Sequence, residues 1–301
     1  MNILFDKINE LKKEKDAVIL AHYYVEPEIQ MIADYVGDSY YLAKIAKETP
    51  CNTIVFCGVE FMGESAKILN PEKTVLLPDP SADCPMAHMA TVEKVQKMKD
   101  EYDDLAVVCY INSSAKLKTV SDVCVTSANA EKIVEALPNK NIFFIPDKNL
   151  GGYIAKKSNK NIILNDGFCP IHNKINIDDI KNIKASHPDA LVLMHPECED
   201  DVLKEADYIG STSGIINYAT NSQHNEFIIV TEIGVLYELQ EKNPDKKFYF
   251  TEPMPVCVDM KKITLEKVAN CLEHGTGEVI IDNETMKKAL IPLDRMLELA
   301  K

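Results

Sequence analysis

An internal repeat constrains the fold of this chain more than any other feature of the sequence. Three segments end at Cys84, Cys169 and Cys257, at intervals of about 85 to 90 residues. Each contains, in order, an acidic residue after a predicted strand, a short helix, a polar turn with Asn and Lys, a second strand, another acidic residue and the cysteine. Length alone suggests about two domains in 301 residues. The repeat instead predicts three small domains, each ending on one cysteine.

Strand and helix signals alternate along the chain, which is typical of α/β architecture. Short apolar runs without alternation indicate parallel strands covered on both faces. We therefore expect three similar three-layer α/β domains with parallel sheets around a pseudo-threefold axis. Their predicted bounds are 1–83 together with 265–301, 84–168, and 169–264, with both C-terminal helices packed on the first domain. Strands are expected at 17–21, 53–57, 74–77, 105–110, 141–145, 161–164, 190–194, 226–231 and 247–250, and helices at 29–49, 91–102, 129–137, 178–186, 264–274 and 284–301.

The charge balance excludes some classes of partner. Acidic residues outnumber basic ones, 47 to 33, for a net charge of −14. This argues against binding to nucleic acid or to an anionic membrane, and it means that an anionic substrate must be captured locally by amides, histidines or a metal. No apolar run is long enough for a membrane span, and residues 1–16 lack the continuous apolar stretch of a signal peptide. We expect a cytoplasmic protein.

Nine cysteines are present, and none are spaced as C-x-x-C. A disulfide framework is not expected in a large cytosolic protein, so most of these residues should be buried thiols. Cys84, Cys169 and Cys257 differ because each follows a strand, and ligands of open α/β units gather at the carboxyl ends of strands. If the domains face one another, these thiols meet in a central cavity. Three thiolates suit zinc or an iron–sulfur cluster with one open iron that acts as a Lewis acid.

Polar residues also follow the first strand of each repeat. His22 and Tyr24 follow the strand at 17–21. Tyr110 and Asn112, and then His195 and Glu197, follow the corresponding strands of the second and third repeats. Their equivalent positions favour one shared cavity. Histidine can bind a carboxylate or transfer a proton, and Tyr24 and Glu197 are further acid–base candidates.

Hydroxyl residues mark three predicted helix N-termini. Ser39 lies in Gly-Asp-Ser, Ser127 in Thr-Ser-Ala-Asn and Thr212 in Gly-Ser-Thr-Ser-Gly. Free amides at helix N-termini bind phosphate and carboxylate, which would supply local positive potential. Residues 58–65 have the spacing of a phosphate-binding loop but carry Glu in place of the required Lys, so an NTPase is rejected.

On these residues the chain resembles the A-type quinolinate synthase family over nearly its whole length. The family has three α/β domains around a pseudo-threefold axis and a [4Fe-4S] cluster held by three cysteines. The resemblance assigns these ligands to Cys84, Cys169 and Cys257, whereas Cys198 matches no ligand position. The matching motifs are AHYY (21–24), GDS (37–39), LPDPSADCPMA (77–87), YINSSAKLK (110–118), TSANA (126–130), PDKNLG (146–151), DGFCPIH (167–172), HPE (195–197), GSTSG (210–214) and PMPVCVDMKKITL (253–265).

The resemblance also implies a reaction. The family condenses iminoaspartate with dihydroxyacetone phosphate to give quinolinate, phosphate and water, within NAD biosynthesis. A transient contact with the aspartate-oxidising enzyme that supplies iminoaspartate is then possible. Some relatives carry a C-x-x-C pair where this chain has Thr251 and Met254, so regulation by such a pair is not expected. Carried over by motif, Tyr24, His195 and Glu197 become acid–base or iron-proximal residues, and His22, Ser39, Tyr110, Asn112, Ser127 and Thr212 become substrate ligands.

Three alternatives stay open on the residues alone. The first is another iron–sulfur hydro-lyase that acts on a hydroxy acid. The second is an iron or redox sensor that uses the same three thiols. The third is a zinc site in place of the cluster.

Overall fold

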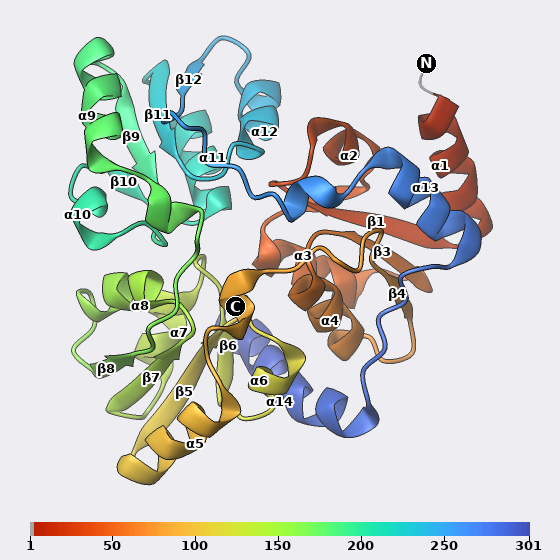
Figure 1. The fold of residues 1–301 in the computed structure, drawn as a ribbon, viewed down its shortest axis with the longest axis horizontal. Helices are drawn as coiled ribbons and strands as arrows, with labels where there is room; N and C mark the ends of the chain where they lie inside the picture. Colours follow the sequence, from red (N-terminus) through yellow and green to blue (C-terminus); the bar gives the residue numbers. More distant parts are fainter. Residues whose placement is uncertain (1–2) are drawn as a thin grey trace.

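Three α/β modules surround a common centre in the computed structural model, which describes residues 3–301 (Figure 1). Within these residues the strands form three parallel four-stranded sheets with one shared order: β2-β1-β3-β4, β6-β5-β7-β8 and β10-β9-β11-β12. We call the units built on these sheets the first, second and third modules. The predicted fold class is thereby confirmed.

Each module places its longest strands at the centre of its sheet. All six residues of β1 are buried, as expected for a parallel strand with helices on both faces. The first module contains α1 (Ile3–Glu14), β1 (Ala17–His22), α2 (Pro27–Ile32), β2 (Tyr35–Gly37), α3 (Ser39–Glu48), β3 (Thr53–Cys57), α4 (Glu60–Leu69) and β4 (Thr74–Leu76). The second contains α5 (Val92–Glu101), β5 (Leu105–Tyr110), α6 (Ala115–Lys118), β6 (Val123–Val125), α7 (Ala130–Ala136), β7 (Asn141–Ile145), α8 (Lys148–Ala155) and β8 (Asn161–Leu164).

The third module follows the same plan and leads into the C-terminal helices. It contains α9 (Ile177–Ser186), β9 (Leu191–Met194), α10 (Asp200–Leu203), β10 (Tyr208–Ile209), α11 (Thr212–Asn221), β11 (Glu226–Val230), α12 (Val235–Lys242) and β12 (Lys247–Tyr249). Helices α13 (Leu265–His274) and α14 (Asn283–Leu299) end the chain. Short 3₁₀ turns come soon after the three repeat cysteines: η1 (Pro85–His88), η2 (His172–Lys174) and η3 (Met260–Lys262).

The continuous helix predicted at 29–49 is wrong. The segment divides into α2, the edge strand β2 and α3. Asp38 ends the strand and caps α3, because its carboxylate accepts a hydrogen bond from the Tyr41 amide at 3.0 Å. The corresponding edge strands β6 and β10 were also missed. These three strands are two or three residues long.

The two C-terminal helices pack in different places. Helix α13 packs on α1 and β3 of the first module, as expected. Helix α14 differs from the expectation, because it packs on α6, β6 and α7 of the second module as well as on α4 of the first (Figure 1). As a result, the first two modules share one continuous apolar core, whereas the third has a separate core on each face of its sheet.

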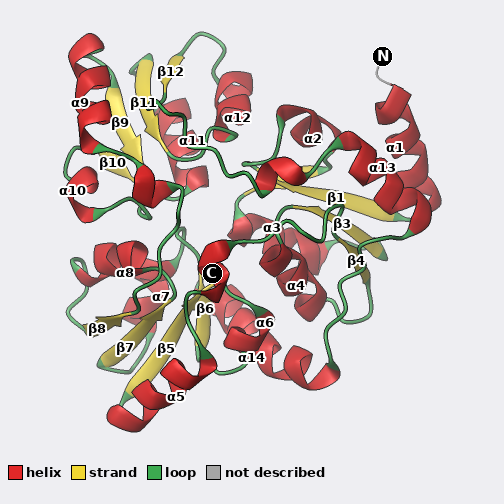
Figure 2. Cartoon of the chain, in the orientation of Figure 1, coloured by secondary structure: helices red, strands yellow, loops and turns green. Residues whose placement is uncertain are grey.

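The shared strand order determines where a site can form. In each sheet the second strand lies on one side of the first strand and the third strand lies on the other side. A topological switch point therefore lies between the first and third strands, which are neighbours in the sheet. Ligands bind at the carboxyl ends of strands at such points. The carboxyl ends of β1, β5 and β9 lie toward the centre of the molecule (Figure 2). None of the helices within residues 3–301 combines the length and the apolar character that a membrane span requires.

Candidate active site

A cavity of about 310 Å³ lies where the three modules meet. Residues from all three line it, mostly in the loops that follow the strands. Every residue that the sequence singled out lines this one cavity, although the sequence placed these residues on segments far apart in the chain. They are His22, Tyr24, Ser39, Cys84, Tyr110, Asn112, Ser127, Cys169, His195, Glu197, Thr212 and Cys257.

The three repeat cysteines reach the cavity from different modules. Cys84, Cys169 and Cys257 are partly exposed, whereas Cys198 is fully buried with its Sγ 3.9 Å from the Val230 carbonyl oxygen. Burial raises the pKa of the Cys84 and Cys169 thiols, and so do the nearby Glu197 carboxylate and the neighbouring thiols. Three soft donors on one cavity are a donor set that fits zinc or an iron–sulfur cluster.

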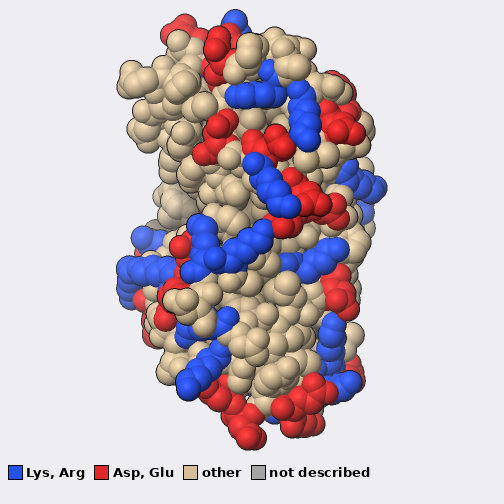
Figure 3. Space-filling view, turned by 90° about the vertical axis from the view of Figure 1, so that its left-hand side faces the viewer, with Lys and Arg blue, Asp and Glu red and all other residues tan. Residues whose placement is uncertain are grey.

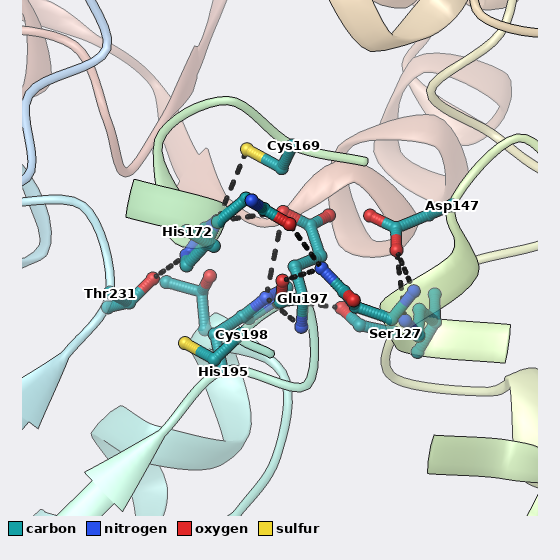
Figure 4. Close-up of polar contacts among 12 residues, drawn as sticks. Ser127, Asp147, Cys169, His172, His195, Glu197, Cys198 and Thr231 are labelled. Atoms are coloured by element: carbon teal, nitrogen blue, oxygen red, sulfur yellow. Dashed lines mark hydrogen bonds and ion pairs between the residues drawn. The ribbon is translucent and has the colours of Figure 1, made fainter. Parts of the chain in front are cut away.

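Glu197 lies at the centre of the polar contacts (Figure 4). Its carboxylate accepts a hydrogen bond from the Tyr110 hydroxyl at 2.6 Å and lies 2.8 Å from His172 Nδ1. His195 Nδ1 is 3.8 Å away, and its ring stacks on that of His172 with centroids 4.7 Å apart. Glu197 is buried, so these partners replace the water that it loses.

The buried polar groups differ in charge. Burial opposes ionisation of Glu197, but His195, His172 and the Tyr110 hydroxyl together lower its pKa to about 2. Burial is the main reason that the pKa of His195 falls to about 3, and the pKa of His22 falls to about 3 for the same reason. Near neutral pH the cavity therefore contains an ionised Glu197 beside uncharged His22 and His195.

A hydrogen-bonded chain connects Tyr24 to Glu197. The Tyr24 hydroxyl lies 2.7 Å from Thr231 Oγ1, which lies 2.9 Å from His172 Nε2. The other ring nitrogen of His172 contacts Glu197. The sequence analysis assigned no role to His172 or Thr231. The signal for His172 was present in the DGFCPIH motif, three residues after Cys169.

Helix N-termini and hydroxyl groups form the other part of the cavity. Ser39 and Thr212 are the first residues of α3 and α11, where backbone amides have no helical partner. Ser127 Oγ lies 3.2 Å from His195 Nε2. Asn112 Oδ1 and Thr126 Oγ1 are buried without a hydrogen-bond partner among the described residues. These groups are available to a polar ligand.

A buried ion pair ties the Cys257 loop to the first module. Glu232 Oε1 accepts a hydrogen bond from the Cys257 amide at 3.0 Å and lies 3.1 Å from Lys261 Nζ. The same ammonium donates to the Tyr24 carbonyl oxygen at 2.6 Å. Glu232 is one of the acidic residues repeated among the modules, and here it positions a cysteine.

We expect Lys261→Met to lower the free energy of unfolding by about 3 kcal/mol, because it leaves the Glu232 carboxylate buried and unpaired. The side chains of this pair are 16% and 1% exposed. The control is Lys204→Met, whose partner Asp201 is 82% exposed, and there the loss should be at most about 1 kcal/mol. Urea unfolding of the two variants measures the difference. Equal losses of unfolding free energy in the two variants would show that the buried pair stabilises the fold no more than an exposed pair.

Stability should fall as the pH falls below 6.5. The folded pKa of His22 is about 3 against an ordinary value of 6.5, so the unfolded chain takes up a proton first. Stability from this residue is complete above pH 6.5 and is lost as the pH falls toward about 3. Between pH 7 and pH 5 the loss is up to about 2 kcal/mol. Urea unfolding at both pH values measures this loss of stability. The loss should be smaller for His22→Asn than for wild type, whereas the exposed control His224→Asn should lose as much as wild type. Identical losses in all three proteins would contradict the prediction.

Three thiols, an ionised carboxylate and uncharged histidines in one inter-module cavity define the class as an α/β enzyme with a candidate metal centre. Comparison with known proteins identifies the family within this class. The family described as quinolinate synthetase A protein matches residues 6–298, and this chain belongs to it. The chain is therefore an enzyme of a family that acts in NAD biosynthesis.

Similar proteins cover the chain almost completely. The quinolinate synthase of Fusobacterium nucleatum is 56% identical over 296 residues, which are 98% of this chain and 99% of that protein. The quinolinate synthase of Clostridioides difficile is 54% identical and covers 98% of this chain and 97% of its own length. That of a Sulfurihydrogenibium species is 50% identical, with 99% of each chain covered.

Proposed function

We propose that this chain condenses iminoaspartate with dihydroxyacetone phosphate, giving quinolinate, phosphate and water. The observation that carries the proposal is the arrangement of one partly exposed thiol per module around a cavity that also holds Glu197. Family membership supports the same reaction, because the relatives are named quinolinate synthase.

Cys84, Cys169 and Cys257 would hold a [4Fe-4S] cluster. A cubane of this kind ordinarily takes four cysteines, and the donor set here offers three on the cavity wall. When bound, the cluster supplies an open iron that acts as a Lewis acid toward a substrate oxygen or nitrogen. Cys198 is buried and does not line the cavity, so it is outside this donor set.

Glu197 is the general base of the proposal. Its ionised carboxylate can take a proton from a carbon or nitrogen of the condensing substrates. The Tyr110 hydroxyl and His172 hold the carboxylate in place at 2.6 and 2.8 Å. The chain through His172 and Thr231 connects this carboxylate to the Tyr24 hydroxyl, so a proton taken at Glu197 can be returned at Tyr24.

The remaining residues bind and orient two anionic reactants. The amides at the N-termini of α3 and α11, at Ser39 and Thr212, suit carboxylate or phosphate oxygens. Uncharged His22 and His195 and the hydroxyl of Ser127 can donate further hydrogen bonds. Asn112 has the unpartnered oxygen described above, which suits a substrate hydroxyl or imine N–H donor. Holding both reactants in one cavity is itself a large catalytic contribution.

The test is a coupled assay with anaerobically purified enzyme. Aspartate and an aspartate oxidase generate iminoaspartate, and quinolinate should appear only when dihydroxyacetone phosphate is added. Another hydro-lyase would not need the triose phosphate. If enzyme with a full complement of iron forms no quinolinate in the presence of both substrates, the proposed reaction is excluded. Co-purification with the oxidase would test the proposed transient contact.

A single metal ion is the second candidate. Ligand atoms of Cys169, His172 and Glu197 all lie within 4.8 Å of one another, a set that can hold one ion such as zinc. Iron, sulfide and zinc analysis distinguishes the two. About four irons and four sulfides per chain support the cluster, whereas one zinc without sulfide supports the single ion.

A further inference from the structure

Most acidic side chains on the cavity wall already have partners. Five carboxylates line the cavity, those of Asp38, Asp83, Glu197, Glu232 and Asp259. Glu232 pairs with Lys261 as described, and Asp259 lies 2.7 Å from Lys262 Nζ. Asp83 lies 2.7 Å from His88 Nε2, and Asp38 accepts a hydrogen bond from Ser213 at 2.5 Å. The acidic groups are thus engaged within the protein.

Lys174 is different. Among residues 3–301 it is the only lysine or arginine that lines the cavity. In the part of the chain that the structure describes, its ammonium makes no ion pair, hydrogen bond or ring contact. Because its side chain is exposed and also lines the cavity, we place it at the rim.

Paired lysines are common on the outer surface. Lysines alternate with acidic residues over the face drawn in Figure 3. Ion pairs such as Lys157 with Glu131 at 2.8 Å and Lys204 with Asp201 at 2.6 Å occur in the second and third modules. A lysine at the rim of a cavity with five carboxylates would be expected to pair with one of them, and Lys174 does not.

The backbone of Lys174 is held between buried neighbours, whereas its side chain has no partner among the described residues. It ends η2, between His172, which is 1% exposed, and Ile175, which is 7% exposed. His172 is held by Glu197 and Thr231. A flexible four-carbon stem on a fixed base can follow an anion as it enters.

We propose that Lys174 captures the anionic substrates at the cavity rim and sets the affinity for a carboxylate or phosphate group. This inference rests on the proposed function and adds a binding residue to it. A chain with a net charge of −14 repels anions at long range, so a local unpaired cation has a large influence on their entry. Proton transfer does not involve Lys174, so turnover at saturation should not depend on it.

The experiment compares Lys174→Met and Lys174→Arg with Lys287→Met in the holoenzyme. Lys287 is an exposed lysine of α14 outside the cavity and is the matched control. At low salt, Lys174→Met should raise the KM for dihydroxyacetone phosphate, the Kd for quinolinate, or both, by about tenfold. Its kcat should stay within about twofold of the wild-type value. Lys174→Arg should restore affinity. The difference from wild type should shrink as salt rises, because ions screen the attraction.

Equilibrium dialysis with inorganic phosphate and with quinolinate makes the test independent of turnover. Weaker phosphate binding by Lys174→Met assigns the ammonium to the phosphate group, and weaker quinolinate binding assigns it to a carboxylate. If Lys174→Met matches Lys287→Met for both probes, or loses kcat at unchanged affinity, the proposal is wrong. Failure of the proposed function would appear differently, as a wild-type enzyme that makes no quinolinate.

Discussion

Glu197→Gln should slow turnover by about 10²- to 10⁴-fold while the iron and sulfide content stays at the wild-type level. Glutamine has nearly the same shape and can still contact Tyr110 and His172, but it has no carboxylate to accept a proton. Because its hydrogen-bonding and charged partners hold the carboxylate ionised at neutral pH despite its burial, the substitution removes the base itself. Steady-state quinolinate formation and iron–sulfide analysis measure the two quantities.

The control for this prediction is Glu199→Gln. Glu199 lies two residues further along the chain and is exposed outside the cavity, so activity should be unchanged. A Glu197→Gln enzyme with more than about a tenth of wild-type kcat would remove Glu197 from the acid–base role. Loss of iron in this variant would instead place Glu197 among the groups that hold the metal centre, as the Cys169–His172–Glu197 set allows.

Cys84→Ala, Cys169→Ala and Cys257→Ala should each abolish both the metal centre and activity. Each substitution removes the only repeat cysteine that its module brings to the cavity. With two protein thiolates left, a cluster lacks a ligand and is easily lost. Anaerobic purification, visible absorption and iron analysis measure the loss.

Cys198→Ser is the matched control for the cysteine series. Cys198 is buried beside the Val230 carbonyl and does not line the cavity, so this variant should keep both iron and activity. Full iron retention in any one of the three alanine variants would remove that residue from the ligand set. Iron loss in Cys198→Ser would show that the ligand assignment is shifted.

The repeat made much of the fold predictable from the sequence. Equivalent acidic residues and cysteines after equivalent strands indicated three modules, and buried strands such as β1 and β5 appear as uninterrupted apolar runs. The edge strands β2, β6 and β10 were missed, although the equally short or slightly longer β4 and β12 were predicted. Strand β2 lies between α2 and α3, and the helical signals on both sides hid its three residues. Helix α14 was placed on the first module because its amphipathic pattern shows only that one face is buried, and not against which module.

The residues of the site were predictable where the repeat supplied equivalents. His22 and Tyr110 end β1 and β5, and His195 directly follows β9, so their convergence could be expected from the equivalent positions in the repeat. His172 and Thr231 have no such equivalents, and only the three-dimensional arrangement shows that they join Tyr24 to Glu197. Lys174 was also missed, since an exposed lysine in an acidic chain carries no sequence signal of its own.

The position of α14 has a consequence for biosynthesis on the ribosome. This helix is translated after the third module, yet it packs on α4 of the first module and on α6 and β6 of the second. The first two modules therefore emerge with an apolar seam that stays open to solvent until the last segment arrives. The contacts between α14 and these elements therefore form only after residues 283–299 have been synthesised.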